Sequence, residues 1–135
     1  MKKFLITSAI AFCINIPAHA SLYPVNLDGD YNCNGTEVGS NEKYTCNMKV
    51  KKTGETYSAT STCNDGSSYI GTGIYNKTNH NFSLVFINPK KSEETGIAIA
   101  EIRKDYSMSS TWTYLNKTSV GHCACVKKHN ALNAI

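Results

Sequence analysis

Apolar and polar side chains alternate one for one in several short segments of this chain, and this alternation limits the folds open to it. Between Tyr44 and Val50, for example, every second residue is aromatic, apolar or a cysteine, and the residues between them are polar. Successive side chains of a β-strand point to opposite faces, so a period of two is typical of a strand with one buried face. No segment after residue 20 repeats apolar residues at the 3.6-residue spacing of a helix. The sequence therefore predicts an all-β fold.

Alternation recurs along the chain, and clusters of Gly, Asn and Asp divide it into eight short candidate strands. The predicted strands are Gly29–Gly35, Tyr44–Lys52, Glu55–Cys63, Ser68–Tyr75, Phe82–Ile87, Gly96–Lys104, Met108–Leu115 and Ser119–Lys127. The connections are short, which favours an up-and-down antiparallel meander in which sequential strands are neighbours. Closing such a meander into a single barrel removes its exposed edges, so we expect an antiparallel barrel of about eight strands.

The first 20 residues have the pattern of a secretory signal peptide. Lys2 and Lys3 precede an apolar run from Phe4 to Ile16, and the segment ends in the small-x-small sequence Ala-His-Ala at 18–20. The apolar run is too short to span a bilayer. We therefore expect cleavage near Ala20, one secreted domain over 21–135, no membrane span, and a periplasmic or extracellular location of bacterial type.

Charge and motifs exclude several function classes. The chain holds 14 basic and 10 acidic residues, and loss of Lys2 and Lys3 with the leader leaves a net charge of about +2, too balanced to indicate nucleic-acid binding. The nucleophile-elbow, zinc-protease and phosphate-loop motifs are absent, and no acid, base and nucleophile fall into a catalytic pattern. We expect a protein that is not an enzyme and needs no cofactor.

Five of the six cysteines follow residue 20, and in an oxidising compartment they indicate disulfides with one thiol left over. Closure makes the first and last strands neighbours, so Cys33 should face Cys123 or Cys125. We predict the Cys33–Cys125 bridge, with Cys46–Cys63 as the second. Cys123 is then the free thiol, available for an intermolecular disulfide in a protein that is otherwise monomeric. Cys123 and Cys125 share a strand face, so the choice between them stays open.

A two-residue turn at 53–54 would place Cys46 opposite Ser61 and diagonal to Cys63 on the same face of the hairpin. This arrangement brings the two cysteines close enough for a disulfide with only a small bulge or twist.

A metal site is the alternative interpretation of the C-terminal cysteines. His122, Cys123, Cys125 and His129 offer the soft nitrogen and sulfur ligands that zinc or cuprous copper prefers. Adjacent residues of a strand point to opposite faces, so His122 and Cys123 would not converge on one ion. We therefore favour structural disulfides and predict no metal.

Four motifs carry a resemblance to known proteins. The sequences GDYNCNG (29–35), GTGIY (71–75), TGIAIAEIRKDYSMSSTWTY (95–114) and VGH (120–122) resemble those of small exported bacterial meander barrels. The Gly-x-Tyr start is similar in position to the Gly-x-Trp of lipocalins, within the calycin group. The 71–75 segment is also similar to a loop of secreted lysozyme inhibitors, which are small disulfide-linked barrels. These resemblances imply a barrel that binds a small ligand or inhibits another protein.

Two function hypotheses follow. A barrel of this strand number is either filled by its own side chains or holds one small ligand. The side chains expected to face inward and to line an apolar site are Tyr44, Met48, Val50, Tyr57, Ile70 and Ile74. In the second hypothesis, a loop such as Asn64–Ser67 or Asn88–Gly96 enters the cleft of a protein partner, for example a hydrolase. A hollow interior would favour the first hypothesis, and a packed interior with a projecting loop would favour the second.

Overall fold

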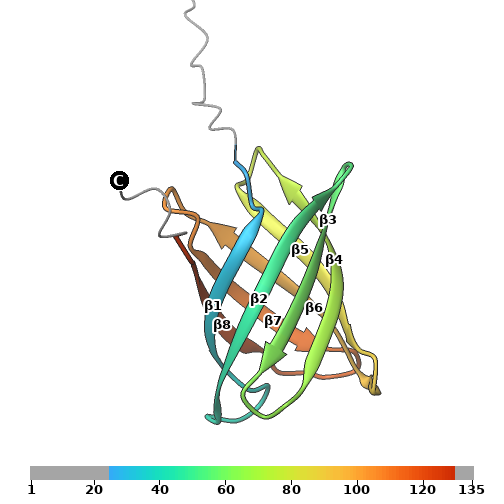
Figure 1. Ribbon diagram of the computed structural model, residues 1–135. Helices are drawn as coiled ribbons and strands as arrows, with labels where there is room; N and C mark the ends of the chain where they lie inside the picture. Colours follow the sequence, from blue (N-terminus) through green and yellow to red (C-terminus); the bar gives the residue numbers. More distant parts are fainter. Residues whose placement is uncertain (1–24, 130–135) are drawn as a thin grey trace, which may run out of the picture.

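The computed structural model describes residues 25–129, and this part of the chain forms a closed eight-stranded antiparallel barrel (Figure 1). Each strand pairs with the next along the chain, and the last pairs with the first. The strands are β1 (Gly29–Thr36), β2 (Lys43–Thr53), β3 (Thr56–Cys63), β4 (Ser68–Asn76), β5 (Asn81–Asn88), β6 (Lys91–Ile102), β7 (Met108–Tyr114) and β8 (Gly121–Lys127). The predicted all-β barrel is thus confirmed. Within residues 25–129, no helix is long and apolar enough to cross a membrane.

Strand β6 begins five residues earlier than the sequence indicates. Lys91 pairs with Asn88 and Thr95 pairs with Ile87, and the register shift between these two pairs leaves residues 92–94 without partners on β5. Asn88 is 4% exposed and its side-chain amide donates to Glu94, which ties the start of β6 to the end of β5. The polar, charged composition of this segment suggests a loop, but the backbone pairing makes it a strand. The expected projecting loop over Asn88–Gly96 is therefore wrong.

The β2–β3 hairpin also differs from its predicted register by one position on each strand. Thr53 pairs with Thr56, so the turn residues are Gly54 and Glu55 rather than Thr53 and Gly54. Gly54 has a φ of 71°, and glycine with positive φ is favoured at the first central position of a two-residue hairpin turn. As a result Cys46 lies directly opposite Cys63, not diagonal to it.

Both predicted disulfides are present, between directly paired residues on adjacent strands. Cys33–Cys125 joins β1 to β8 across the closure of the barrel, and Cys46–Cys63 joins β2 to β3. Cys123 is the free cysteine among the described residues. Disulfides of this kind persist in oxidising compartments, which fits a periplasmic or extracellular protein.

One end of the barrel is sealed by the segment that precedes β1. Leu27 and Tyr31 are fully buried, and the Tyr31 hydroxyl donates to the Leu27 carbonyl oxygen at 2.8 Å. The Lys127 ammonium lies 4.7 Å from the centre of the Tyr106 ring and donates to the Asn26 carbonyl oxygen. Residues 25–28 lie at the upper end of the barrel in Figure 1, where these buried side chains and contacts close it.

We predict that the two disulfides stabilise the barrel unequally. Their cysteines are 92 and 17 residues apart, so the chain-entropy model gives Cys33–Cys125 an advantage of about 1.5 kcal/mol in unfolding free energy. Denaturant titration of Cys33→Ala/Cys125→Ala and Cys46→Ala/Cys63→Ala proteins measures the difference. Equal losses in the two double variants would contradict the entropic account.

Replacing Tyr31 with phenylalanine should lower the free energy of unfolding by about 1–2 kcal/mol, because the change removes a buried hydrogen bond. Thermal or denaturant unfolding checks the value. Tyr75→Phe is the control, since the Tyr75 hydroxyl is exposed where it contacts His80. A Tyr31→Phe protein as stable as the control would show that the hydroxyl does not hold the seal.

Candidate functional site

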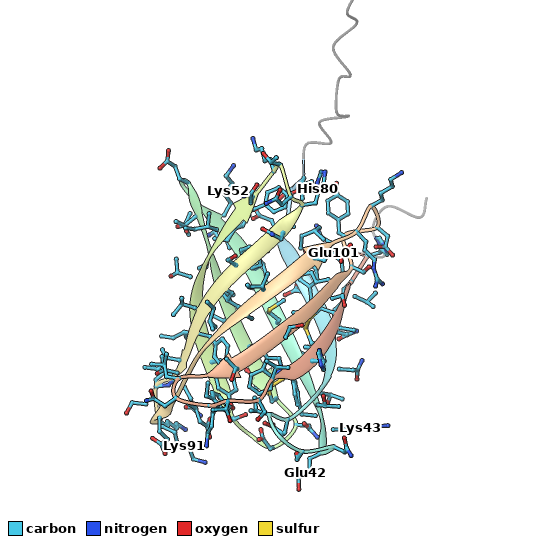
Figure 2. The ribbon with its side chains drawn as sticks, turned by 180° about the vertical axis from the view of Figure 1, so that it is seen from behind. Glu42, Lys43, Lys52, His80, Lys91 and Glu101 are labelled. Carbon is cyan, nitrogen blue, oxygen red and sulfur yellow. A yellow bond between two sulfur atoms is a disulfide. The ribbon has the colours of Figure 1, made fainter. Side chains whose placement is uncertain are left out.

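The barrel interior is hollow between the sealed end and the opposite end. The cavity has a volume of about 140 Å³, and its lining is almost entirely apolar. The loop residues that line it, Glu37, Asp65 and Ser67, belong to the β1–β2 and β3–β4 connections. The cavity therefore opens at this end, which we call the mouth. Glu42, Lys43 and Lys91 mark the same end in Figure 2, while Lys52, His80 and Glu101 mark the sealed one.

One wall of the cavity is rich in sulfur. Four cysteines lie side by side on β3, β2, β1 and β8, because the register pairs Cys63 with Cys46, Cys46 with Cys33, and Cys33 with Cys125. Met48 and Met108 also line the cavity. Thioether and disulfide sulfur atoms are polarisable and pack well against aromatic rings. This wall therefore presents a polarisable, apolar surface to the cavity.

The part of the cavity nearer the mouth is lined by aromatic rings in edge-to-face contact. Trp112 lies at the centre of this group, with ring centres 5.9 Å from Tyr44, 6.1 Å from Phe86 and 5.1 Å from Tyr114. Tyr69 contacts Phe86 in the same geometry at 5.7 Å. We call Tyr44, Tyr69, Phe86, Trp112 and Tyr114 the aromatic cluster.

Inward-facing glycines make room for these rings. Gly35 is paired with Tyr44, and Gly121 with Trp112. A Cβ atom on Gly35 would collide with the Tyr44 ring, and one on Gly121 would lie 2.6 Å from Trp112 Cε2. The two rings therefore lie against glycine backbone on either side of the β1–β8 closure.

A chain of hydrogen bonds crosses the mouth. The Tyr69 hydroxyl donates to Glu94 Oε2 at 2.8 Å, and its oxygen lies 3.2 Å from the Tyr114 hydroxyl. Because Tyr69 spends its single hydrogen on Glu94, Tyr114 is the donor in the second contact. Asn88 also donates to Glu94 Oε2, and Lys91 lies 3.5 Å from Glu94 Oε1. Glu94 is thus fully partnered.

The carboxyl groups at the mouth have shifted pKa values. Burial raises the pKa of Glu37, and the negative charges of Asp65, Glu94 and Glu42 raise it further. Burial alone would also raise the pKa of Glu94, but hydrogen bonds from Asn88 and Tyr69 and the charge of Lys91 lower it on balance. Burial, the hydrogen bond to Tyr69 and the charges of Glu37 and Glu94 all raise the pKa of Tyr114. The ionised form of Glu37 is therefore disfavoured, first by burial and then by its acidic neighbours.

Cys123 lies inside the barrel beside the closing disulfide. Its Sγ is 3.8 Å from Cys125 Sγ, and the sulfurs of Cys33, Cys123 and Cys125 lie within 4.8 Å of one another. Burial raises the pKa of the Cys123 thiol, against smaller lowering effects of Tyr44 and Ser110. Cys123 lines the cavity and is partly buried. The intermolecular disulfide through Cys123 stays a prediction.

The four side chains of the alternative metal site do not converge. His122 is exposed on the outer face, where its Nδ1 lies 3.5 Å from Thr111 Oγ1, whereas Cys123 and Cys125 face inward. Cys125 is also already bonded to Cys33, and His129 is exposed after the end of β8.

The predicted ligand-binding residues divide into three groups. Tyr44 and Met48 line the cavity as expected. Val50 and Tyr57 are buried, at 1% and 5% exposure, but they pack in the core toward the sealed end and not around the cavity.

Ile70 and Ile74 point outward, which is a correction. Ile74 is 62% exposed and Ile70 is 50% exposed, although the backbone of β4 at Ile70 forms part of the cavity wall. The inward positions of β4 belong to Gly71 and Gly73, because Phe82 occupies the space where a Gly73 side chain would lie. Alternation alone identifies two faces, and the bulk of the isoleucines wrongly suggests that theirs is the buried one.

Several residues of the mouth were not anticipated, chiefly Glu37, Tyr69, Glu94 and Tyr114. The alternation of β4 contains a signal for one of them, because Tyr69 and Tyr75 share a face with the two glycines. Glycine beside aromatic residues on one face indicates close ring packing. No sequence pattern places Glu37 or Glu94, because both positions depend on loop and bulge geometry.

No model of a known protein family matches this chain, and a search of curated proteins finds no significant match. The class is therefore defined by the fold and the site alone. The protein is a small disulfide-linked antiparallel barrel with one sealed end, one open end and an apolar cavity between them.

We predict that Cys123 reacts slowly with iodoacetamide. In a Cys13→Ser protein, Cys123 is the one thiol left by the two bridges. Its raised pKa leaves little thiolate at pH 8, so alkylation should be about tenfold slower than in the protein unfolded in urea, and should speed up at higher pH. Mass spectrometry of timed reactions measures both rates. Equal rates would mean that the thiol is not buried.

Proposed function

We propose that this protein binds a small, largely apolar ligand inside its barrel and is not an enzyme. The observation that carries the proposal is the cavity of about 140 Å³, open at the mouth and lined by apolar atoms. Binding sites for small molecules are typically concave, mostly apolar and supplied with a few polar groups. Here the polar groups gather at the mouth, where they would orient a ligand as it enters.

The size of the cavity limits the ligand. An engineered apolar cavity of roughly 150 Å³ in another protein stays dry and binds benzene. Drug-sized ligands usually occupy roughly 300 Å³ or more. The cavity therefore suits a molecule of about six to ten non-hydrogen atoms, such as a single substituted aromatic ring, and is too small for a long-chain lipid.

Protein interaction, including inhibition of a lysozyme-type hydrolase, is the alternative function. One observation favours it, which is a patch of exposed apolar residues on the outer face of neighbouring strands β4, β5 and β6. These residues are Ile70, Ile74, Val85, Ile97 and Ile99, each 44–62% exposed. Apolar surface of this kind often marks a protein contact. The hollow interior and the loss of the expected loop at Asn88–Gly96 favour the ligand-binding function.

We also propose that the protein acts outside the cytoplasm as a monomer, after cleavage near Ala20. The predicted cleavage site falls outside the described residues. The proposal is supported by the two disulfides and by the signal-peptide pattern of the first 20 residues.

Filling the cavity should abolish binding. Ala98 lines the cavity on β6 between Leu84 and Trp112, so Ala98→Leu would occupy the space and leave stability unchanged or slightly higher. Toluene should bind the unmodified protein with a Kd on the order of 0.1 mM and should perturb the fluorescence of Trp112, the single tryptophan.

Ala124→Leu is the matched control, because Ala124 is exposed on the outer face of β8. It should bind toluene as the unmodified protein does. Toluene binding that persists in Ala98→Leu, or no binding to the unmodified protein, would contradict the proposed function. A protein-interaction function would survive the Ala98→Leu change.

A further inference from the structure

The aromatic cluster and the mouth together form a site with a defined electrostatic character. Trp112 is 8% exposed, and its indole Nε1 has no hydrogen-bond partner. That edge of the ring is turned to the wall, because a Cβ on Gly121 would lie 2.7 Å from Nε1. The N–H is therefore not available to a ligand. What Trp112 and its neighbours offer inside the cavity is aromatic surface, whose faces carry partial negative charge.

Unpaired negative charge lies at the entrance to this aromatic surface. Glu37 lines the cavity and is partly buried, and among residues 25–129 its carboxylate has no salt bridge and no hydrogen-bonded side chain. Glu94, by contrast, is bonded to Tyr69, Asn88 and Lys91. The Asp65 carboxylate accepts hydrogen bonds from Ser67. Of the two carboxylates that line the cavity, Glu37 and Asp65, Glu37 is thus the one without a salt bridge or side-chain hydrogen bond among the described residues.

The tyrosine hydroxyl groups at the mouth also favour a ligand that donates a hydrogen bond. Tyr114 spends its hydrogen on Tyr69, so its oxygen keeps a free lone pair. Burial is the largest cause of the raised pKa values of Glu37 and Tyr114, and repulsion from nearby negative charge adds to it. A positive group at this point would relieve that repulsion.

We propose that the ligand of this barrel is a small organic cation with one apolar ring, an arylalkyl ammonium, whose ring enters the cavity and whose ammonium group lies at the mouth beside Glu37. This inference rests on the proposed ligand-binding function. Attraction of a cation to Trp, Tyr and Phe rings and to a carboxylate is the usual chemistry by which proteins recognise organic ammonium groups. Carboxylates alone are common on protein surfaces. Here one stands unpaired at the entrance of an aromatic-walled cavity whose size fits a single ring.

The test compares three ligands of nearly equal size and different charge. Benzylammonium, benzyl alcohol and benzoate share the ring and differ in carrying a positive, neutral or negative group at pH 7. We expect benzylammonium to bind about tenfold more tightly than benzyl alcohol, and benzoate to bind more weakly than either. Titrations followed by Trp112 fluorescence or by calorimetry give the three dissociation constants without any substitution.

Two variants then locate the charge effect. Glu37→Gln keeps the shape of the side chain and removes its charge, so benzylammonium should bind within about twofold of benzyl alcohol. Glu42→Gln is the matched control, because Glu42 is on the same loop but is exposed and does not line the cavity. The control should keep most of the preference for the cation.

Each outcome has a distinct meaning. A cation preference that is lost in Glu37→Gln and kept in Glu42→Gln supports the inference. Equal binding of benzylammonium and benzyl alcohol would overturn it while leaving the proposed function in place. A preference that Glu37→Gln does not change would also overturn it, because the charge would then act from elsewhere. Failure of all three ligands to bind would overturn both proposals.

Discussion

Pairing of β1 with β8 is the contact on which the rest of the structure depends. Every other strand pair joins neighbours along the chain, so its loop is short, whereas this pair brings together residues 92 positions apart. The entropic cost of closing a loop grows with its length, so the β1–β8 pair, which we call the seam, is the least favourable pairing to form. Cys33–Cys125 holds it covalently. Gly35, Gly121 and Cys123 lie along the same seam and form part of the cavity wall or its support, so an open seam would also remove the site.

The hollow interior follows from how the aromatic residues are accommodated. Small barrels are usually filled by large inward side chains, and this barrel has enough rings to fill itself. Several of these rings lie over inward glycines, as Tyr44 does over Gly35 and Phe86 over Gly96. A ring that lies against bare backbone occupies the wall and leaves the axis free. The glycine–aromatic pairs therefore leave a cavity lined by rings where other small barrels have a filled core.

The sequence predicts the architecture well and the site only in part. Strand number, closure and Cys46–Cys63 follow from alternation and from the positions of the cysteines, because each is a property of regular pairing. The same pattern gives Cys33 a partner on the last strand but leaves Cys123 and Cys125 as alternatives, and the structure selects Cys125. The inward face of β4 does not follow, since it depends on Phe82 of the neighbouring strand filling the space above Gly73. Glu37 and Glu94 are equally out of reach, because one lies in a loop and the other in a strand extended by a bulge. Regular pairing can be predicted from local patterns, but contacts between strands at a barrel end cannot.

An empty cavity has a cost, and its size explains why a domain this small carries two crosslinks. Cavity volume lowers stability by roughly 24 cal/mol per Å³ in core substitutions, so about 140 Å³ corresponds to about 3 kcal/mol. Each disulfide contributes about 3–5 kcal/mol in the chain-entropy model, which offsets the loss. Crowded carboxylates at the mouth add to the cost, since the raised pKa of Glu37 means that its ionised form is less favourable there than in water. The cavity and the unpaired carboxylate of Glu37 lower the free energy of unfolding at the same end of the barrel. A ligand that filled the cavity and neutralised the carboxylate would recover both losses of stability.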